Sequence, residues 1–504
     1  MHPLNRFFAA VLALACSQSL PGQSDVAFPQ TVYANRRAKL IRELNAPVVL
    51  AGRQVAGADD NNRQDPNFWY LTGVESPYAV VVVLPPRGAR DARTILFLPD
   101  TFQFAGGQFP ALDEGFRRAV WNRPRRRLAP GAGARTATGA DATHPIDSLL
   151  PRLRELIGDA RLVYTALGAD GYAPPGMTLP RSVAAQFAAA LATALPNAQL
   201  KDVTPAVQRL RLIKDQHEVA ALRRAAEISA LGMLEGLRAV RPGMNDLELA
   251  GLMEYIWKRN GSPRPAFPPI VSSGENALTF FSLLRENYNA VDRVMRPGDL
   301  VFVDYGAAEY RMYAADICRT WPASGRFTAE QRKYYDIVLE AQEAAIAAIR
   351  PGVTMLDVIK VAAQVFRKHG LEPFEDIARM GADRAWGIMP SPTHYLARDA
   401  GIVRYSPLGR GVRDLGHHIG LEVQDSRDYS MPLQPGMVFT IEPKIYIPEK
   451  NIAIMIEDMI LVTESGHENL SASVPKRAAD IERVMAEGKR MNAWRPGGTI
   501  PLAR

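Results

Sequence analysis

The sequence predicts an α/β protein built from two domains. A chain of 504 residues is longer than one ordinary hydrophobic core serves, so two domains are expected. The first part alternates helical and strand-like patterns, whereas the second opens with long helices and then becomes strand-rich. The hydrophobic share of 47% and the charged share of 22% are typical of a soluble globular protein. We expect an N-terminal domain at 24–205, a second domain at 206–487 and a tail at 488–504.

The first domain is expected to hold a mixed sheet. Residues 31–44 carry apolar side chains at helical spacing, and the Ala-rich segment 181–195 also predicts a helix. Buried strands are predicted by short apolar runs at 47–52, 79–85, 94–99 and 161–167.

The second domain is expected to begin just before a long charged helix. That helix is predicted over residues 210–240 and ends before Pro242-Gly243, and a second long helix covers 328–350. Apolar runs that predict strands are at 267–274, 299–307, 437–443 and 452–463.

The N-terminus has the pattern of an export signal over residues 1–23. Arg6 precedes a short apolar run, and Ala13-Leu14-Ala15 resembles a cleavage site. We therefore expect a periplasmic or secreted protein, with a lipid anchor at Cys16 as an alternative form of processing and a buried N-terminal helix as the alternative structure. After cleavage Cys318 is the interior cysteine, so no intrachain disulfide is expected.

The net charge of +7 invites a nucleic-acid interpretation. Its densest stretch is the Arg-rich segment 117–127, which lacks a groove-binding motif and has little aromatic interleaving. We expect a solvated loop or an oligomer contact there and no nucleic-acid partner. After the first twenty residues no apolar stretch is long enough to cross a membrane. A homo-oligomer is the expected assembly.

Metal-ligand chemistry is indicated by five residues of the second domain. Four carboxylates and one imidazole suit hard or borderline ions such as Mn²⁺, Co²⁺ or Zn²⁺. Their charge of about −4 would balance two divalent cations. These residues are Asp304, Asp316, His417, Glu442 and Glu457.

Each of these residues also has a structural explanation when taken singly. An Asp at a strand end is often a turn residue. However, Glu457 lies in an otherwise apolar strand pattern, where an unpaired carboxylate is costly to bury, and Asp304 ends a similar apolar run. The placement therefore favours a shared site.

The order of motifs resembles the aminopeptidase P and prolidase family. The segments that carry the likeness are VFVDYGAAEYRMYAADICRTWP, GHHIGLEVQD, PGMVFTIEP and IMIEDMILVTESGHENLS, and RQDPNFWYLTG in the first domain is similar to that family's N-terminal domain. The likeness runs from about Val32 to about Met485. It implies a "pita-bread" catalytic domain with a dinuclear metal centre.

The resemblance also implies roles and a reaction. Asp304 would chelate one ion, Asp316 and Glu457 would bridge both, and His417 and Glu442 would complete the second. A metal-activated hydroxide would hydrolyse the bond between an N-terminal residue and a following proline in a peptide substrate. Glu442 would transfer protons, first as base and then as acid. Mn²⁺ is the expected metal, with Co²⁺ or Zn²⁺ as alternatives.

Four positions depart from the family pattern. Phe281, Arg413 and Gln424 stand where the family usually has histidines, and Met455 stands where Arg is common. Arg413 cannot act as a base because its guanidinium stays protonated. His418 and His394 are candidate substitutes for the lost histidines, although a structural role is the simpler explanation for each.

One further departure concerns spacing. Asp304 and Asp316 are twelve positions apart, one more than the family usually has, so regular strand pairing would turn one of them to the wrong face. We expect a bulge or a longer turn between Gly306 and Tyr313, with Asp316 on a short strand.

These departures leave other functions open. One is a dinuclear metallopeptidase without proline specificity, and another is an inactive metal-binding scaffold. A metal-independent hydrolase of the creatinase type is a third, but such a site has no need for four converging carboxylates.

Overall fold

The computed structural model describes residues 26–53, 63–99, 128–168, 182–278, 292–373, 404–405, 415–425 and 431–490. The chain forms two compact units, Met1–Leu210 and Arg211–Arg504. The predicted signal, Cys16, the Arg-rich segment 117–127, Phe281, His394 and Arg413 all lie outside the described residues. Within the described ranges, no helix has the length and apolar character needed to cross a membrane.

The first unit contains a six-stranded mixed sheet, as the sequence predicts. Its strand order is β4-β3-β2-β1-β5-β6, with β2 antiparallel to both β1 and β3 and the other neighbouring pairs parallel. The sequence does not reveal β4 and β6, because these edge strands contain no fully buried residue and carry no apolar run. The strands are β1 (Val48–Ala51), β2 (Val80–Leu84), β3 (Arg93–Leu98), β4 (Ala142–Pro145), β5 (Leu162–Thr165) and β6 (Gln199–Asp202).

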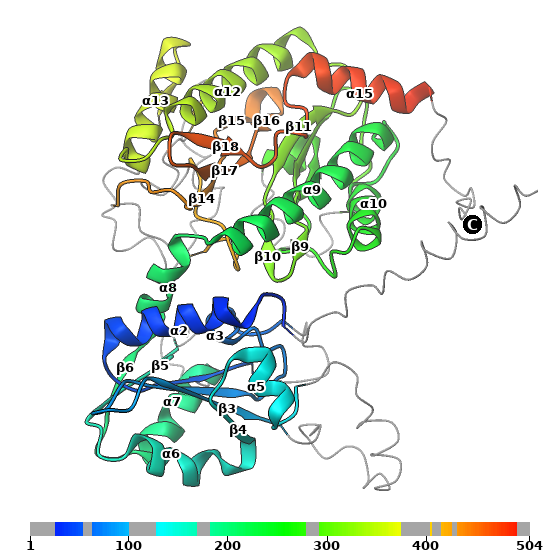
Figure 1. Cartoon of the computed structure of the whole chain (residues 1–504). Coiled ribbons are helices and arrows are strands. Elements are labelled where there is room, and N and C mark those ends of the chain that lie inside the picture. The colour runs from blue at the N-terminus through cyan, green and yellow to red at the C-terminus, as the bar shows by residue number, and fades with distance from the viewer. Residues whose placement is uncertain are drawn as a thin grey trace, which may run out of the picture. The chain divides into compact units, whose positions relative to one another are not determined.

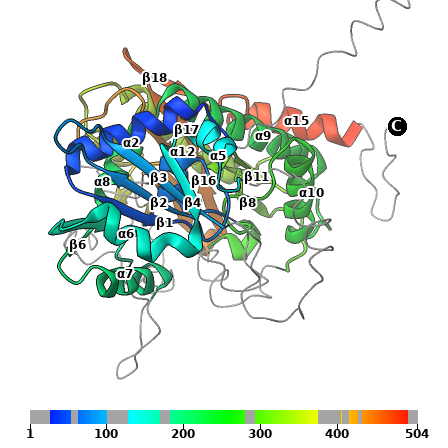
Figure 2. The same cartoon turned by 60° about the horizontal axis from the view of Figure 1, so that its bottom comes forward.

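Helices cover both faces of this sheet (Figures 1 and 2). On one face, apolar residues of α6 and α7 pack against Val49, Val82 and Phe97 of the strands. On the other face lie α2 and α3, and Tyr33 of α2 packs edge-on against Trp69 of α3. The helices are α2 (Gln30–Leu44), α3 (Pro66–Thr72), α5 (Ala132–Thr138), α6 (Leu149–Ile157) and α7 (Val183–Ala194), with a short 3-10 turn, η2 (Ile146–Ser148).

The long helix predicted over residues 210–240 is two helices in the structure. These are α8 (Thr204–Leu212), which contains the division between the units, and α9 (Gln216–Ala239). Asp215 begins α9 with a capping box, because its side chain accepts from the Glu218 backbone N–H while the Glu218 side chain accepts from that of Asp215. Helical spacing of apolar residues continues across this cap, so the pattern alone does not show the break.

Helices of the second unit form two groups. In one group α9 packs against α10 (Asp246–Arg259) and α15 (Ala478–Arg490), and in the other α12 (Ala329–Ala348) packs against α13 (Met355–Lys368). Figure 1 shows both groups around the strands. α15 continues through Gly488, into the segment that the sequence assigns to the tail. A Cβ on Gly488 would lie 2.0 Å from the Arg238 carbonyl oxygen, so the glycine lets α15 approach α9 closely.

The strands of the second unit form small sheets at its centre. Their orders are β11-β8-β7, β14-β17-β18, β12-β13-β15-β16 and β10-β9. The fold class that the sequence predicts is therefore confirmed. The strands are β7 (Val271–Ser273), β8 (Leu300–Asp304), β9 (Glu309–Tyr310), β10 (Tyr313–Ala314), β11 (Cys318–Pro322), β12 (Glu372–Pro373), β13 (Arg404–Tyr405), β14 (Val438–Ile441), β15 (Lys444–Ile447), β16 (Ile452–Met455), β17 (Asp458–Val462) and β18 (His467–Asn469), and the short helical turns are η3 (Gly274–Leu278) and η7 (Pro448–Lys450).

A bulge absorbs the extra residue between the two Asp residues. Asp304 pairs with Cys318, and Glu309 pairs with Ala314. The step from Asp304 to Glu309 is five positions, whereas the step between their partners is four. The chain then turns through Arg311 and Met312, both with positive φ. The strand is therefore one residue longer on the Asp304 side, and the register at the ligands is preserved.

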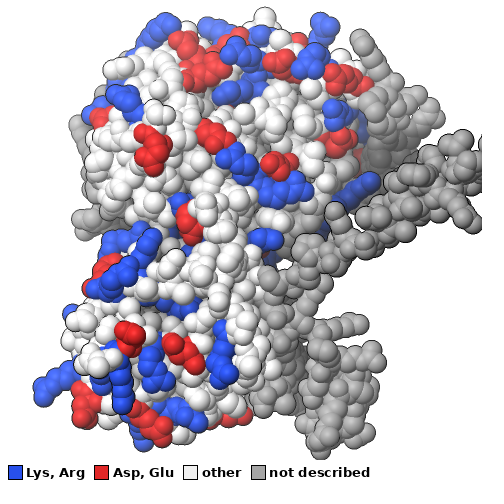
Figure 3. Space-filling model, viewed as in Figure 1, with Lys and Arg blue, Asp and Glu red and all other residues white. Residues whose placement is uncertain are grey.

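The surface charge is mixed. On the face shown in Figure 3, Lys and Arg side chains alternate with Asp and Glu over both units. No continuous basic stripe crosses the described residues of that face, so the net charge of +7 is not concentrated there.

Candidate metal centre

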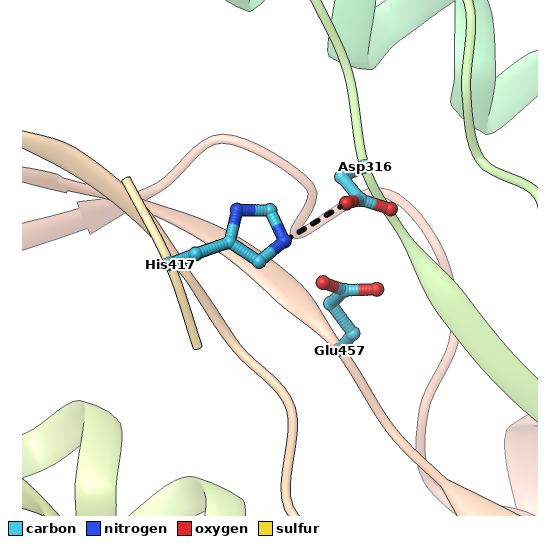
Figure 4. Close-up of side chains that lie close together, drawn as sticks. All are labelled: Asp316, His417 and Glu457. Carbon is cyan, nitrogen blue, oxygen red and sulfur yellow. Dashed lines mark ion pairs between the residues drawn. The ribbon is translucent and has the colours of Figure 1, made fainter. Parts of the chain in front are cut away.

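Three of the five predicted ligands lie together in the second unit. Donor atoms of Asp316, His417 and Glu457 are all within 4.8 Å of one another (Figure 4). His417 Nε2 lies 3.3 Å from Asp316 Oδ2 and 3.7 Å from Glu442 Oε1, which adds a fourth residue at the edge of this group. Asp304 stands outside the three-residue group, but its buried carboxylate is close enough to those of Asp316 and Glu442 for their charges to raise its pKa.

Neighbouring strands hold the carboxylates in place. Asp304 is the last residue of β8 and pairs with Cys318, the first residue of β11. Glu457 lies between β16 and β17, and its backbone N–H donates to the Cys318 carbonyl oxygen at 3.0 Å. The prediction that Asp316 lies on a strand is wrong, since it precedes β11 by two positions. Side chains two positions apart on an extended chain point to the same face, so Asp316 lies on the face of Cys318. Cys318 pairs with Asp304, and the two Asp side chains therefore lie on the same side.

Thr440 of β14 positions both His417 and Glu442. The His417 backbone N–H donates to Thr440 Oγ1 at 3.1 Å, and the Thr440 hydroxyl donates to Glu442 Oε1 at 3.3 Å. Gly416 allows this close approach, because a Cβ there would lie 1.8 Å from the Thr440 carbonyl oxygen. The hydroxyl of Thr440 thus connects the backbone of His417 with the carboxylate of Glu442.

The ring of His417 is oriented for metal binding. Its Nδ1 lies 3.2 Å from the backbone carbonyl oxygen of His418, which can only accept a hydrogen bond. The neutral ring therefore carries its proton on Nδ1 and presents the lone pair of Nε2. Nε2 is the atom that faces Asp316 and Glu442.

The carboxylates of the site are buried close to one another, and both conditions disfavour their charged forms. Burial, reinforced by the neighbouring acidic groups, raises the pKa of Asp304 and Glu457 well above the usual range. Burial also raises the pKa of Asp316, although the nearby imidazole of His417 opposes this. For His417, burial acts to lower the pKa, but Asp316 and Glu442 raise it above the usual value.

These residues fit a divalent metal ion. Two atoms that are each about 2.1 Å from one ion lie about 3–4 Å apart, the separation seen between His417 Nε2 and its carboxylate neighbours. Asp316 Oδ1 and Glu457 Oε2 are buried and accept no hydrogen bond within the described part of the chain. A cation would satisfy both oxygens and relieve the repulsion among the carboxylates.

The described departures from the family pattern have no acid–base role in the structure. Gln424 is exposed, and Met455 is buried in an apolar cluster with Phe302 and Ile270. His418 is 1% exposed and packs edge-on against Phe439 with ring centroids 5.2 Å apart, as expected of a structural residue. The remaining positions, Phe281, Arg413 and His394, lie outside the described residues.

Three residues that shape the site are not indicated by the sequence. These are Thr440, Lys444, whose ammonium lies 3.2 Å from Glu442 Oε2, and Arg319, which donates to the Glu457 carbonyl oxygen. Thr440, Glu442 and Lys444 alternate along the chain, so a period-2 reading of TIEPK could have grouped them. Nothing in the local sequence around Arg319 indicates its contact.

Comparisons with known proteins agree with this geometry. Residues 220–464 match the metallopeptidase family M24 and residues 33–164 match the aminopeptidase P N-terminal domain. The chain is 31% identical to Xaa-Pro aminopeptidase of Escherichia coli (strain K12) over 91% of its own length and 98% of that protein. The chain therefore belongs to the aminopeptidase P family.

Solved structures of the aminopeptidase P family share its fold. E. coli aminopeptidase P with the inhibitor Pro-Leu has a TM-score of 0.70 and 28% identity, and the alignment covers 92% of this chain and 99% of that one. The Zn-substituted E. coli enzyme in complex with product gives the same TM-score, identity and coverage, namely 0.70, 28%, 92% and 99%. The expectation of a metal-dependent peptidase of the Xaa-Pro aminopeptidase type is confirmed by this family membership.

Proposed function

We propose that this protein is an exported, dinuclear-metal exopeptidase that releases an N-terminal residue from a following proline. The observation that carries the proposal is the group Asp316, His417 and Glu457, with two buried carboxylate oxygens that accept no hydrogen bond in the described ranges. Glu442 and Asp304 beside this group bring the ligands to five, enough for two ions that share bridging carboxylates.

Each residue has a defined part in this proposal. Asp304 would hold one ion, Asp316 and Glu457 would be shared by both, and His417 and Glu442 would hold the other. Mn²⁺ is the proposed metal, while the Zn-substituted E. coli relative supports Zn²⁺ as an alternative. Bound divalent ions supply Lewis acidity toward water and the peptide carbonyl. Glu442 accepts a proton from the attacking water and returns it to the leaving amine.

Peptide hydrolysis with purified protein tests the proposal. Mature protein loaded with Mn²⁺ is offered Xaa-Pro peptides and matched Xaa-Ala peptides, and released N-terminal residues are quantified together with bound metal. We expect two ions per chain and a clear preference for Xaa-Pro. We expect the Asp316→Ala variant to bind less metal, because a bridging ligand is gone. Its kcat/KM should fall at least about 1,000-fold. An Asp316→Ala variant as active as wild type contradicts the assignment.

A second candidate is a metallopeptidase without proline preference. It is favoured by Gln424 and Met455, which occupy positions where the family has His and Arg. Cleavage of Xaa-Ala peptides with no release from any Xaa-Pro peptide would select this candidate. Two bound ions with no hydrolysis of either set would instead indicate a scaffold.

Export is a separate part of the proposal. The pattern at residues 1–23 supports it. Fractionation of a Gram-negative host that expresses the full chain should place the cleaved protein in the periplasm or medium, and Cys16→Ala should leave this unchanged unless the protein is lipid-anchored. Full-length protein in the cytoplasm would refute export without affecting the enzymatic assignment.

A further inference from the structure

A lysine lies among the acidic residues of the metal centre. Lys444 is the first residue of β15, is 8% exposed and points its ammonium at Glu442 Oε2 from 3.2 Å. Lysine is almost never buried to this extent without a partner. Its position cannot be explained as a surface ion pair.

The two oxygens of Glu442 face different partners. Oε2 faces Lys444, whereas Oε1 accepts from the Thr440 hydroxyl at 3.3 Å and lies 3.7 Å from His417 Nε2. The carboxylate is therefore held from both sides, with one oxygen turned to the imidazole. Without Lys444, the carboxylate would keep its contact with Thr440 but lose the one at Oε2, and it would turn more easily about its last side-chain bond.

The charge of Lys444 also reaches the other ligands. Burial raises the pKa of Asp304 and of Glu457, and Lys444 opposes that rise at both residues. The ammonium thus offsets part of the negative charge that four buried carboxylates concentrate in one place.

Lys444 stands directly opposite Met455 in the β15–β16 pair. Met455 is 1% exposed and lies two positions before Glu457. Side chains that are directly opposite in an antiparallel pair lie on the same face, with Cβ atoms about 4.5–5.5 Å apart. A cation on either strand could therefore reach the same carboxylates, and in this chain the cation is on β15.

We propose that Lys444 is a positioning residue of the metal centre, which fixes Glu442 by one carboxylate oxygen and supplies from β15 the positive charge that position 455 lacks. This inference rests on the proposed function for its kinetic readout but not for its metal-binding readout. Glu442 is the proposed proton acceptor, so its orientation affects turnover more than substrate binding.

Replacement of Lys444 should change metal binding and turnover in opposite directions. In Lys444→Met the cluster is more negative, and we expect Mn²⁺ to bind about tenfold more tightly by isothermal titration calorimetry of the metal-stripped protein. Turnover is measured as the release of N-terminal residues from Xaa-Pro peptides. We expect kcat to fall about 10–100-fold with KM changed less than about threefold.

Two further variants test the role of the charge itself. Lys444→Arg should keep both properties within a few-fold of wild type, because the cation remains. Lys444→Met with Met455→Arg should recover most of the turnover and return the Mn²⁺ affinity toward wild type, because the cation is restored from the opposite strand. Lys450→Met is the matched control, since Lys450 lies on the surface in an ion pair with Glu330 and should leave both readouts unchanged.

The outcomes separate the inference from the proposed function. A Lys444→Met protein with unchanged Mn²⁺ affinity and kcat overturns the inference, as does a parallel loss of both that Met455→Arg does not recover. If Lys444→Met does not fold, as judged by circular dichroism, the same comparison is made with the neutral Lys444→Gln. Wild-type protein that binds Mn²⁺ without cleaving peptides would refute the proposed function, and calorimetry would still decide the role of Lys444.

Discussion

Glu457 and Asp458 are consecutive residues at the junction of β16 and β17, both buried, in opposite electrostatic surroundings. Asp458 accepts from Arg319 at 2.7 Å, Ser471 and Asn469 at 2.9 Å and Lys476 at 3.0 Å. Although burial alone would raise the pKa of Asp458, the positive charges of Arg319 and Lys476 lower it to about 2. Glu457 instead faces other carboxylates, and its pKa is raised well above the usual range.

The difference separates a structural carboxylate from a functional one. Asp458 is neutralised by side chains that the fold provides, so the folded state is complete at this position. Glu457 is left with an oxygen that accepts no hydrogen bond within the described residues, so its group is completed only by a cation from solution. Burial by itself does not distinguish the two residues; the partners do.

The largest expected effect is the loss of stability when the structural carboxylate, Asp458, is removed. Asp458→Ala leaves the Arg319 guanidinium buried without its carboxylate, and both side chains are 0% exposed. We expect the free energy of unfolding to fall by about 3–5 kcal/mol, measured by urea denaturation of the metal-free protein. The Arg477→Ala control, which removes a surface pair with Glu343, should change it by less than about 1 kcal/mol. A loss of similar size in both variants would contradict the comparison.

Addition of Mn²⁺ should stabilise the folded protein only when the carboxylate of Glu457 is present. At a free Mn²⁺ concentration 100 times its dissociation constant, one site adds about 2.7 kcal/mol to the stability of wild type. Thermal unfolding with and without Mn²⁺ should show this gain in wild type and little of it in Glu457→Gln, which lacks the ligand charge. Equal gains in the two proteins would mean that Mn²⁺ binds elsewhere.

Asp246 is an intermediate case, with a backbone hydrogen bond but incomplete charge compensation. It accepts from the Ser273 N–H at 3.0 Å, and burial raises its pKa to about 6 despite nearby Arg293, with Asp299 adding to the rise. Because the folded pKa exceeds the unfolded one, this group's contribution to stability is full below about pH 4 and is lost as pH rises through 6.

The variant Asp246→Asn tests that sign. We expect it to raise the free energy of unfolding by about 2 kcal/mol at pH 8 relative to wild type, and to have a smaller effect at pH 5. Urea denaturation at the two pH values checks this. A larger gain at pH 5 than at pH 8 would show that the sign is wrong.

The smallest expected effect is a gain in the stability of the metal-free protein when Glu457 is replaced. Glu457→Gln removes one buried negative charge from the cluster, so the metal-free variant should melt about 2–4 °C above metal-free wild type. Differential scanning calorimetry in the presence of a chelator measures the shift. A lower melting temperature would mean that Glu457 is structurally satisfied without metal.

The sequence predicts the fold class and proposes five candidate ligands, three of which the structure brings together, because the ordered motifs are local. It does not predict residues whose role comes from distant partners. Arg319 meets Asp458 across a separation of 139 positions. Lys444 is only two positions from Glu442, but their contact depends on how the chain runs from β14 into β15, which the spacing alone does not give. The break at Asp215 is missed because a capping box can interrupt a pattern without changing its apolar period.

The bulge between Asp304 and Glu309 also determines where the length of this hairpin can change. The ligands lie on one side of it, whereas the β9–β10 turn lies on the other. A deletion of Ala307 would restore regular pairing beyond the ligands and shift only the hairpin tip. Insertions and deletions among homologues can therefore accumulate at this hairpin while the spacing of the ligands in space stays constant, so an alignment gap here carries no information about catalytic competence.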